Sequence, residues 1–439
     1  MKRLKNNTMQ KRNMRHYLFF ISFLSLFLWS CSSTQQISRR NLSEVYKTGN
    51  EKLQTDFLVY HNSEKESTVH FQIDTKKLTY ARQSSAENGI YSAKAKIQYM
   101  LFKSYDDHEL VDSGSMQIED FSNQLDQHLI YGKFNIPVNY GAYNALMVQI
   151  TDVYQDETFD YYITIDKTSH DNRQNFLAVD PETNTPIFRD WFYDNEEIHI
   201  MYSNESISSL HIKYYNRDFD IAPPPFVVYN PKQFDYLTDN EFDVSISNEG
   251  YFSFKTTVEG FYHIQVDPNK REGFTLFHYN DGFPKINTPY EMVSALRFVT
   301  SKNEFEDLMD AADQKEALDK FWLRIANNPD RARELIKAYY NRVQNANIFF
   351  SCHKEGWKTD RGIVYIVFGP PDIVYKSSSA ESWVYGEENN YLSVTFNFIK
   401  VDNPFSDRDY TLKRSPIYKN QWYRAVDSWR QGRVTSLDY

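Results

Sequence analysis

Short runs of alternating apolar and polar residues recur about every ten residues from position 56 to position 167. In one of them, Ile97, Tyr99 and Leu101 fall on the same face, and such alternation indicates a strand with one buried side. Eight runs at this spacing are typical of an antiparallel sandwich. The sequence therefore predicts a β-sandwich domain over residues 51–168.

A second set of such runs lies between positions 175 and 280. Three consecutive prolines, Pro223 to Pro225, interrupt it, and proline cannot donate a hydrogen bond to a central strand ladder. We assign these prolines to a loop or a sheet edge. The sequence predicts a second β-rich domain over residues 169–285, in tandem with the first.

After residue 286 the apolar residues follow a helical period. Ser301 and Glu304 have the spacing of a capping box, and Asn328 with Pro329 indicates the start of another helix. We expect helices over residues 314–326 and 329–350, and a last one over residues 419–431.

The run 363–368 lies between these helices and contains apolar residues only. Turn formers bound it on both sides, so we predict a fully buried strand. Further strand candidates follow, at 373–375, 382–385 and 392–399. Helices followed by a strand meander predict an α+β domain over residues 286–439.

The first thirty residues have the organisation of a signal peptide. They hold six Lys and Arg and no acid, and their apolar run of about thirteen residues is too short to span a bilayer. The run ends in Leu28-Trp29-Ser30-Cys31, which resembles the lipobox of bacterial lipoproteins except for the large Trp29. The resemblance implies that residues 1–30 are removed and that fatty acyl chains such as palmitate are attached to Cys31. Several acyl chains make a stable membrane anchor.

The residues after Cys31 bear on where the anchor lies. No acidic run follows that would resemble a surface-export signal, and position 32 is Ser rather than the Asp of inner-membrane retention. We therefore expect a lipid-anchored protein of the outer membrane that faces the periplasm. Residues 31–50 are polar and without pattern, and we predict a flexible tether there.

Composition narrows the classes of partner. The chain has 49 Lys and Arg against 59 Asp and Glu, and without the first thirty residues the ratio is 43 to 59. Such an acidic chain is a poor match for nucleic acid. Aromatic residues make up 16% of the sequence, which fits either cross-strand pairs in β domains or a surface on which sugars stack.

Cysteine content offers little chemistry. The lipobox removes Cys31 from disulfide formation and leaves Cys352 as a free, buried thiol. Cys352 and His353 make a weak half of a metal site because no second Cys lies nearby. We expect no metal and no cofactor.

The C-terminal region also resembles a known family. The residues that carry the resemblance are Phe321-Trp322, Asn328-Pro329, Tyr339, Arg342-Val343, Ala346-Asn347, Phe350, Gly356-Trp357-Lys358-Thr359-Asp360-Arg361-Gly362, Tyr365-Ile366, Phe368-Gly369-Pro370-Pro371-Asp372 and Trp383-Val384-Tyr385. This order over residues 290–435 resembles the GWxTD-domain family of uncharacterised envelope proteins, largely from Bacteroidota. The resemblance implies an extracytoplasmic lipoprotein with β domains ahead of this unit, and it brings no activity, cofactor or catalytic residue.

Two loops of this region are the candidate site. Their residues are Gly356, Trp357, Thr359, Asp360, Arg361, Gly362, Gly369, Pro370, Pro371 and Asp372. Three interpretations stay open: a turn that braces itself, with Trp357 packed on the helices; a rigid surface for a partner; or a catalytic carboxylate at Asp360 or Asp372. No nucleophile or general base has a matching spacing, so the last lacks support.

Short catalytic motifs for metalloproteases, hydrolases, phosphate-binding loops and calcium loops do not occur in the sequence. We therefore expect a non-enzymatic lipoprotein that works through protein–protein contacts, as a subunit or accessory of an envelope machine such as outer-membrane protein assembly or secretion. The alternative is a glycan-binding or glycan-processing envelope protein, which requires exposed Trp side chains in a groove. A third hypothesis is an enzyme whose active site has no recognisable sequence motif.

Overall fold

The computed structural model describes residues 37–48, 52–82, 90–122, 126–229, 232–280, 282–388 and 390–434. The predicted signal peptide, Cys31 and the start of the predicted tether lie outside the described residues. Within the described ranges, no helix is both long and apolar enough to span a bilayer. From Ile37 onward the chain forms one compact unit.

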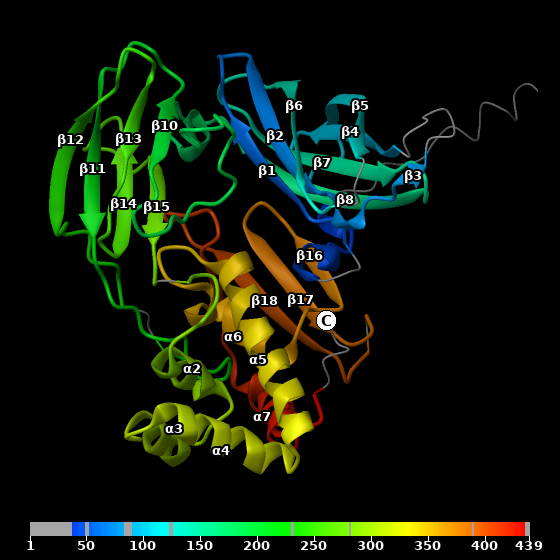
Figure 1. Cartoon of the computed structure of the whole chain (residues 1–439), viewed down its shortest axis with the longest axis vertical. Coiled ribbons are helices and arrows are strands. Elements are labelled where there is room, and N and C mark those ends of the chain that lie inside the picture. The colour runs from blue at the N-terminus through cyan, green and yellow to red at the C-terminus, as the bar shows by residue number, and fades with distance from the viewer. Residues whose placement is uncertain are drawn as a thin grey trace, which may run out of the picture. The chain divides into compact units, whose positions relative to one another are not determined.

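The first β region is a sandwich of two antiparallel sheets (Figure 1). One sheet consists of β1 (Thr55–Tyr60), β2 (Glu66–Asp74) and β6 (Leu129–Pro137). The other consists of β3 (Ala81–Arg82), β4 (Tyr91–Phe102), β5 (Leu110–Ser122), β7 (Tyr143–Asp152) and β8 (Glu157–Asp166). Val69, Phe71, Ile97 and Val148 meet between the sheets, as the alternating pattern predicts.

The second β region again has two antiparallel sheets around its own core. The smaller contains β9 (Phe176–Val179), β10 (Ile198–Tyr202) and β13 (Tyr251–Phe254). The larger contains β11 (Ser209–Tyr215), β12 (Asn240–Ser245), β14 (Gly260–Gln265) and β15 (Phe274–His278). Ile200, Phe252, Ile212 and Ile264 fill the space between them.

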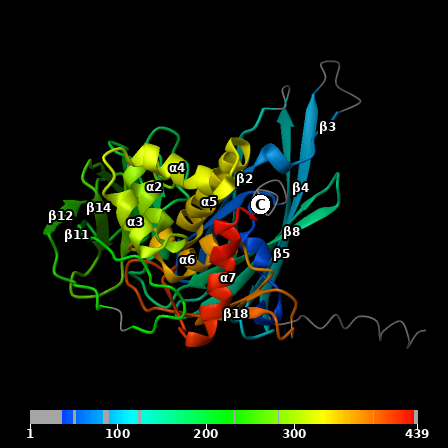
Figure 2. The same cartoon turned by 90° about the horizontal axis from the view of Figure 1, so that it is seen from below.

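The C-terminal region joins helices to a four-stranded antiparallel sheet. The helices are α2 (Pro289–Ala295), α3 (Lys302–Met309), α4 (Gln314–Ala326), α5 (Pro329–Phe350), α6 (Asp360–Phe368) and α7 (Lys419–Arg430). The sheet has the order β16 (Ile373–Lys376), β17 (Ala380–Tyr385), β18 (Val394–Lys400) and β19 (Tyr410–Leu412). Helices α2 to α5 form one group (Figures 1 and 2). The predicted class, β-rich domains followed by an α+β region, is confirmed.

Helix boundaries follow the capping chemistry of the sequence. Ser301 and Glu304 form the predicted capping box of α3, and Asn328 caps α5 with Pro329 in the first turn. Packing against the sheet comes from aromatic rings: Phe350 of α5 lies 5.4 Å from Trp383 of β17, measured between ring centroids. The long helix α5 therefore packs on the sheet through an aromatic contact at its C-terminal end.

The predicted strand at residues 363–368 is wrong, because these residues belong to helix α6. Thr359 caps the helix by accepting a hydrogen bond from the Gly362 N–H, Asp360 occupies the first turn, and Gly369 ends it with a φ of 90°. Nearly every side chain of α6 is buried, so its sequence shows neither a helical stripe nor an alternation. Period alone cannot distinguish a short, fully buried helix from a buried strand.

The predicted flexible tether is wrong over residues 37–48. These residues form two short 3-10 turns, Ile37–Arg39 and Ser43–Tyr46, that pack into the core of the C-terminal region. The Leu42 N–H donates to the carbonyl of Val374, and the Tyr365 hydroxyl donates to the carbonyl of Tyr46. The few apolar side chains of this segment have no regular period, so the sequence gives no sign of their burial.

The cap of α6 can be tested by substitution. Thr359→Ala removes the acceptor for the Gly362 N–H and the donor to the Gly356 carbonyl, both of which are buried. We expect the free energy of unfolding to fall by about 1–2 kcal/mol, measured by chemical denaturation. Thr359→Ser keeps the hydroxyl and serves as the control, with a much smaller loss. Equal losses in the two variants would contradict the capping role.

Candidate functional site

The Gly-Trp-x-Thr-Asp stretch lies at the centre of the C-terminal region and leads into α6. Gly356 and Gly362 mark two places where backbone touches backbone. A Cβ atom on Gly356 would lie 1.9 Å from the carbonyl oxygen of Ala346, and one on Gly362 would lie 1.9 Å from the carbonyl oxygen of Gly356. Any side chain at either position would therefore push apart α5, the turn and α6.

Trp357 anchors the turn on the neighbouring helices. Its ring is buried and meets Phe298 edge-on, with centroids 6.5 Å apart. Its backbone N–H donates to the side-chain oxygen of Asn347 on α5 at 3.1 Å. Thr359 then begins α6 rather than an isolated turn, which explains why a hydroxyl residue stands there.

Asp360 forms a buried ion pair with Arg414. The carboxylate also accepts a hydrogen bond from the N–H of Leu412, the last residue of β19, at 2.8 Å. Arg414 in turn donates to the carbonyls of Pro223 and Pro224 at 2.6 and 2.7 Å. The proline run of the second β region is therefore a loop fixed on the motif, and Asp360 has a structural partner for its charge.

Arg361 forms a second buried ion pair, with Glu381 of β17 at 3.2 Å. The Tyr46 hydroxyl donates to the same carboxylate at 2.8 Å, and the Lys376 ammonium lies 3.6 Å from it. Burial by itself would raise the pKa of Glu381, but the neighbouring guanidinium and ammonium groups outweigh it and hold that pKa below its usual range. Glu381 thus stays ionised although its side chain is fully buried.

Hydrogen bonds hold the loop 369–372, which follows α6. The Tyr385 hydroxyl donates to the carbonyl of Gly369 at 2.9 Å, and the Gly386 N–H donates to the Asp372 carboxylate at 2.6 Å. Asn41, from the N-terminal segment, donates to the carbonyl of Asp372 at 3.1 Å. These bonds fix the loop against β17 at one end and against residues 37–48 at the other.

Burial decides between the interpretations of the candidate residues. Gly356, Trp357, Thr359, Asp360, Arg361, Gly362, Gly369 and Pro371 are buried, Pro370 is partly buried, and only Asp372 is exposed. The buried members of the set offer no surface to a partner, and their burial favours the bracing interpretation for them. Sequence reasoning missed the counterparts Tyr46, Glu381 and Arg414, because no local pattern links them to the motif.

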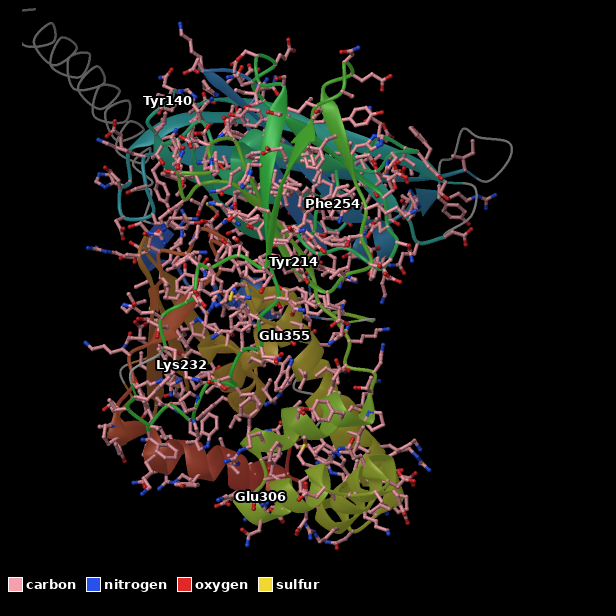
Figure 3. All side chains as sticks on the ribbon, turned by 90° about the vertical axis from the view of Figure 1, so that its left-hand side faces the viewer. Tyr140, Tyr214, Lys232, Phe254, Glu306 and Glu355 are labelled. Carbon is pink, nitrogen blue, oxygen red and sulfur yellow. The ribbon has the colours of Figure 1, made fainter. Side chains whose placement is uncertain are left out.

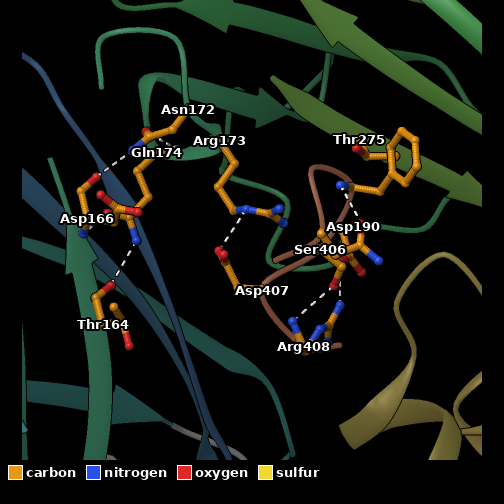
Figure 4. Close-up of polar contacts among 12 residues, drawn as sticks. Thr164, Asp166, Asn172, Arg173, Gln174, Asp190, Thr275, Ser406, Asp407 and Arg408 are labelled. Atoms are coloured by element: carbon orange, nitrogen blue, oxygen red, sulfur yellow. Dashed lines mark hydrogen bonds and ion pairs between the residues drawn. The ribbon is translucent and has the colours of Figure 1, made fainter. Parts of the chain in front are cut away.

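The loop between β18 and β19 contacts the second β region and the segment that follows β8 (Figure 4). The guanidinium of Arg361 donates to the carbonyl of Arg408 at 2.7 Å, and Arg408 pairs with Asp190 of the second β region. The adjacent Asp407 pairs with Arg173, between the two β regions in the chain, at 2.7 Å. The loop that Arg361 bonds is therefore joined by ion pairs to the second β region and to the segment between the two β regions.

A cavity of about 610 Å³ lies beside the motif, between the second β region and the C-terminal helices. Its walls include Glu355 and Lys358, which form an ion pair at 2.8 Å, and the buried His278. Figure 3 labels Glu355 between the strand of Tyr214 and the helix of Glu306. Neither Asp360 nor Asp372 lines this cavity, so the carboxylates considered for catalysis lack a place for a substrate there.

Cys352, His353 and Asp409 bring potential metal ligand atoms within 4.8 Å of one another. Among the described residues this is the one such group of three or more, and the sequence did not point to Asp409. The Asn403 amide donates to both His353 Nδ1 and the Asp409 carboxylate at 2.8 Å. Since this amide stands where an ion bridging those two ligands would lie, the group is satisfied by hydrogen bonds, and its residues fit a metal poorly.

The thiol of Cys352 is equally unsuited to attack a substrate. Cys352 is free and fully buried, as the sequence predicts. Burial raises the pKa of its thiol to about 12, with a contribution from nearby Asp409. At neutral pH the thiolate that would act as a nucleophile is therefore scarce.

Comparison with protein families gives a match to the GWxTD domain over residues 260–431. The chain contains a GWxTD domain. The match includes β14 and β15 of the second β region, so it begins ahead of the boundary at residue 286 that the sequence predicts. The resemblance of the C-terminal region to the GWxTD domain is thereby confirmed, and residues 356–360 spell the Gly-Trp-x-Thr-Asp stretch.

Other comparisons add little. No match was found among curated proteins. Among solved structures, red sea bream transglutaminase aligns at 8% identity with a TM-score of 0.18, over 54% of this chain and 33% of the transglutaminase. This chain thus spans about a third of that protein.

The close contact at Gly362 gives a sharp test. In an ordinary helix Gly→Ala stabilises by about 1 kcal/mol. Here Gly362→Ala would place a methyl group against a carbonyl oxygen, which cannot rotate away as a side chain can. We expect a loss of at least about 3 kcal/mol in the free energy of unfolding. Lys320→Ala, on the exposed side of α4, is the control and should change it by less than about 0.5 kcal/mol.

His353 should make the protein less stable in mild acid. Burial lowers the pKa of His353, whereas an unfolded histidine binds a proton near pH 6.5. Between about pH 7 and pH 5 the unfolded chain therefore binds more protons than the folded chain, and stability falls. His353→Asn keeps an acceptor for Asn403 but cannot titrate, and should reduce the loss over this interval by about 1–2 kcal/mol.

Urea titrations at several pH values measure this effect. A remaining slope is expected, because burial also lowers the pKa of His61 to about 4 and that of His263 to about 3. Identical slopes for the wild type and His353→Asn would show that His353 is protonated in the folded protein.

Proposed function

We propose that this protein is an outer-membrane-anchored periplasmic lipoprotein that acts through protein–protein contacts, as a subunit or accessory of an envelope machine such as outer-membrane protein assembly or secretion. The observation that carries the proposal is the packing of residues 37–48 into the core of the GWxTD domain. This segment begins six residues after Cys31, the residue that the lipobox resemblance marks for acylation.

The spacing has a mechanical consequence. Six residue steps reach at most about 20 Å when fully extended. An acyl anchor on Cys31 would therefore hold the GWxTD domain close to the membrane surface, rather than at the end of a long tether. A fixed position near the membrane suits a component that docks onto neighbouring envelope proteins.

The chemistry of the motif supports a scaffold more than a catalyst. Asp360 forms an ion pair with Arg414, and Arg361 forms one with Glu381. The Asp372 carboxylate accepts a backbone hydrogen bond. The cavity beside the motif contains neither aspartate. Binding through the surfaces of β domains that are held rigid is the function that this arrangement favours.

The glycan-binding alternative requires Trp side chains on the surface. Of the six Trp within the described residues, Trp322, Trp357, Trp383, Trp422 and Trp429 are buried and Trp191 is partly buried. The described part of the chain therefore lacks the exposed Trp platform on which that alternative depends.

Lipid attachment can be measured directly. Cells fed a clickable palmitate analogue should label the wild-type protein and the Cys352→Ala control, and both should sediment with outer membranes. Cys31→Ser should lose the label and the membrane association, because it lacks the acylated thiol. Label retained in Cys31→Ser, or an unlabelled wild type, would remove the anchor from the proposal.

The partner half of the proposal needs a separate measurement. Affinity purification in mild detergent at native expression, after chemical crosslinking, should recover other envelope proteins with the wild type. Cys31→Ser should recover fewer, since it no longer concentrates at the membrane. Recovery of this protein alone, or turnover of a substrate by the purified protein, would overturn the interaction role.

A further inference from the structure

Strand β5 forms a long open edge of the first sandwich. It is 13 residues long and pairs with β4 from end to end, apart from a register shift at Val111. On its other side, the backbone groups of residues 111–121 that point away from β4 have no strand partner within the described ranges. Unpaired N–H and C=O groups in a row are a template on which another extended chain can form hydrogen bonds.

The sandwich core is incompletely covered beside this edge. No residue of β5 is buried, and β6, which follows it in the chain, has Ile136 as its only buried residue. The inward-facing Met116 and Ile118 of β5 are only partly buried, as are Ile130 and Phe134 of β6. By contrast, β7 in the middle of the same sheet is buried at most positions.

Strand β5 of one sheet and strand β6 of the other lie on the same side of the sandwich core. Tyr99 of β4 stacks on Phe134 of β6, with ring centroids 5.0 Å apart, and Tyr99 is the register partner of Gly114 on β5. His128, just before β6, lies 3.1 Å from the Asp120 carboxylate of β5. A strand added to β5 would therefore place its inward side chains over the half-exposed apolar groups of both strands.

We propose that the β5 edge, defined as the side of residues 111–121 opposite β4, binds an extended, Lys- and Arg-rich segment of a partner protein as an added strand. This inference rests on the proposed function, because it names the surface and the kind of partner through which the protein–protein contacts are made. The partner's backbone bonds to β5, and its inward apolar side chains cover Met116 and Ile118.

Charge selects the partner. Residues 104–132 contain seven acids and no Lys or Arg: Asp106, Asp107, Glu109, Asp112, Glu119, Asp120 and Asp126. Lys103 and Lys94 pair with Glu109 and Glu119, but in the described part of the chain no Lys or Arg pairs with Asp112 or Asp120. A basic segment would meet complementary charge along this edge.

The same charges disfavour a second copy of this chain. Two antiparallel β5 edges would bring Asp112 and Asp120 of one copy toward those of the other, and like charges on facing strands repel. Asp112 accepts a hydrogen bond from Tyr99, and Asp120 one from Tyr80, so both carboxylates are held at the edge. Acidic groups on an open edge thus prevent self-pairing while they admit a basic strand.

Photo-crosslinking in cells at native expression tests the proposal. A photoreactive phenylalanine analogue is placed at Ser115 or Gln117, both exposed on β5, and at Ser245, exposed on the shorter edge strand β12, as the control. We expect adducts from the β5 positions and none from Ser245. Mass spectrometry of the adduct should map to a partner segment with more Lys and Arg than Asp and Glu.

A charge variant supplies the second readout. With the crosslinker at Ser113, S115K/Q117K should reduce the yield of the adduct about tenfold, because two added positive charges repel a basic strand. N240K/S245K adds the same charge to β12 and should leave the yield unchanged. Thermal denaturation of the purified variants checks that both remain folded.

Each outcome decides the proposal. Adducts of equal yield from β5 and β12, adducts with a second copy of this chain, or a partner segment that is acidic would overturn it. If affinity purification recovers partners but none crosslinks from β5, this docking surface is wrong while the proposed function stands. If affinity purification recovers no partner, the proposed function itself fails.

Discussion

Two buried ion pairs at the start of α6 fix how the segments around this helix are arranged. Asp360 pairs with Arg414, and Arg361 pairs with Glu381. Two adjacent residues of opposite charge in the first turn of α6 thus each bind a different partner. Breaking a buried pair by removing one partner costs about 3–5 kcal/mol, because it leaves an uncompensated charge away from water. A well-packed apolar replacement of both partners costs little, so such pairs are better at fixing a geometry than at adding stability. We infer that the motif serves to specify an arrangement.

What the pairs specify is the meeting of distant chain segments. Through Arg414 the motif holds the proline loop of the second β region, through Arg408 it reaches Asp190, and through Glu381 it binds Tyr46 near the described N-terminal end. Each connection uses directional hydrogen bonds of a charged or hydroxyl group, and such bonds allow fewer alternative arrangements than apolar packing. The β regions and the C-terminal region thus share one compact unit.

Sequence patterns predicted the helices and strands that have one side in water and the other in the core. The alternation in β4 and the caps at Ser301 and Asn328 report a local contrast, and the structure has these elements in place. The pattern failed for α6, where burial on all sides removes the contrast, and for residues 37–48, where burial comes from contacts with a region hundreds of residues away. The motif could be recognised from its residues, but its ion-pair partners could not, since nothing local in Glu381 or Arg414 marks them as buried charges.

The N-terminal segment also determines what counts as a folding unit. The Tyr46 ring lies among three rings of the C-terminal region, Phe350, Trp383 and Phe349, at centroid distances of 5.2, 5.0 and 5.6 Å. A polypeptide that began at residue 286 would lack this ring and the hydroxyl that bonds to Glu381, and it would expose apolar surface to water. The core of the GWxTD domain is therefore completed by residues that precede both β regions in the chain. Because this segment begins six residues after Cys31, the acyl anchor that we propose would act on the core of the GWxTD domain itself.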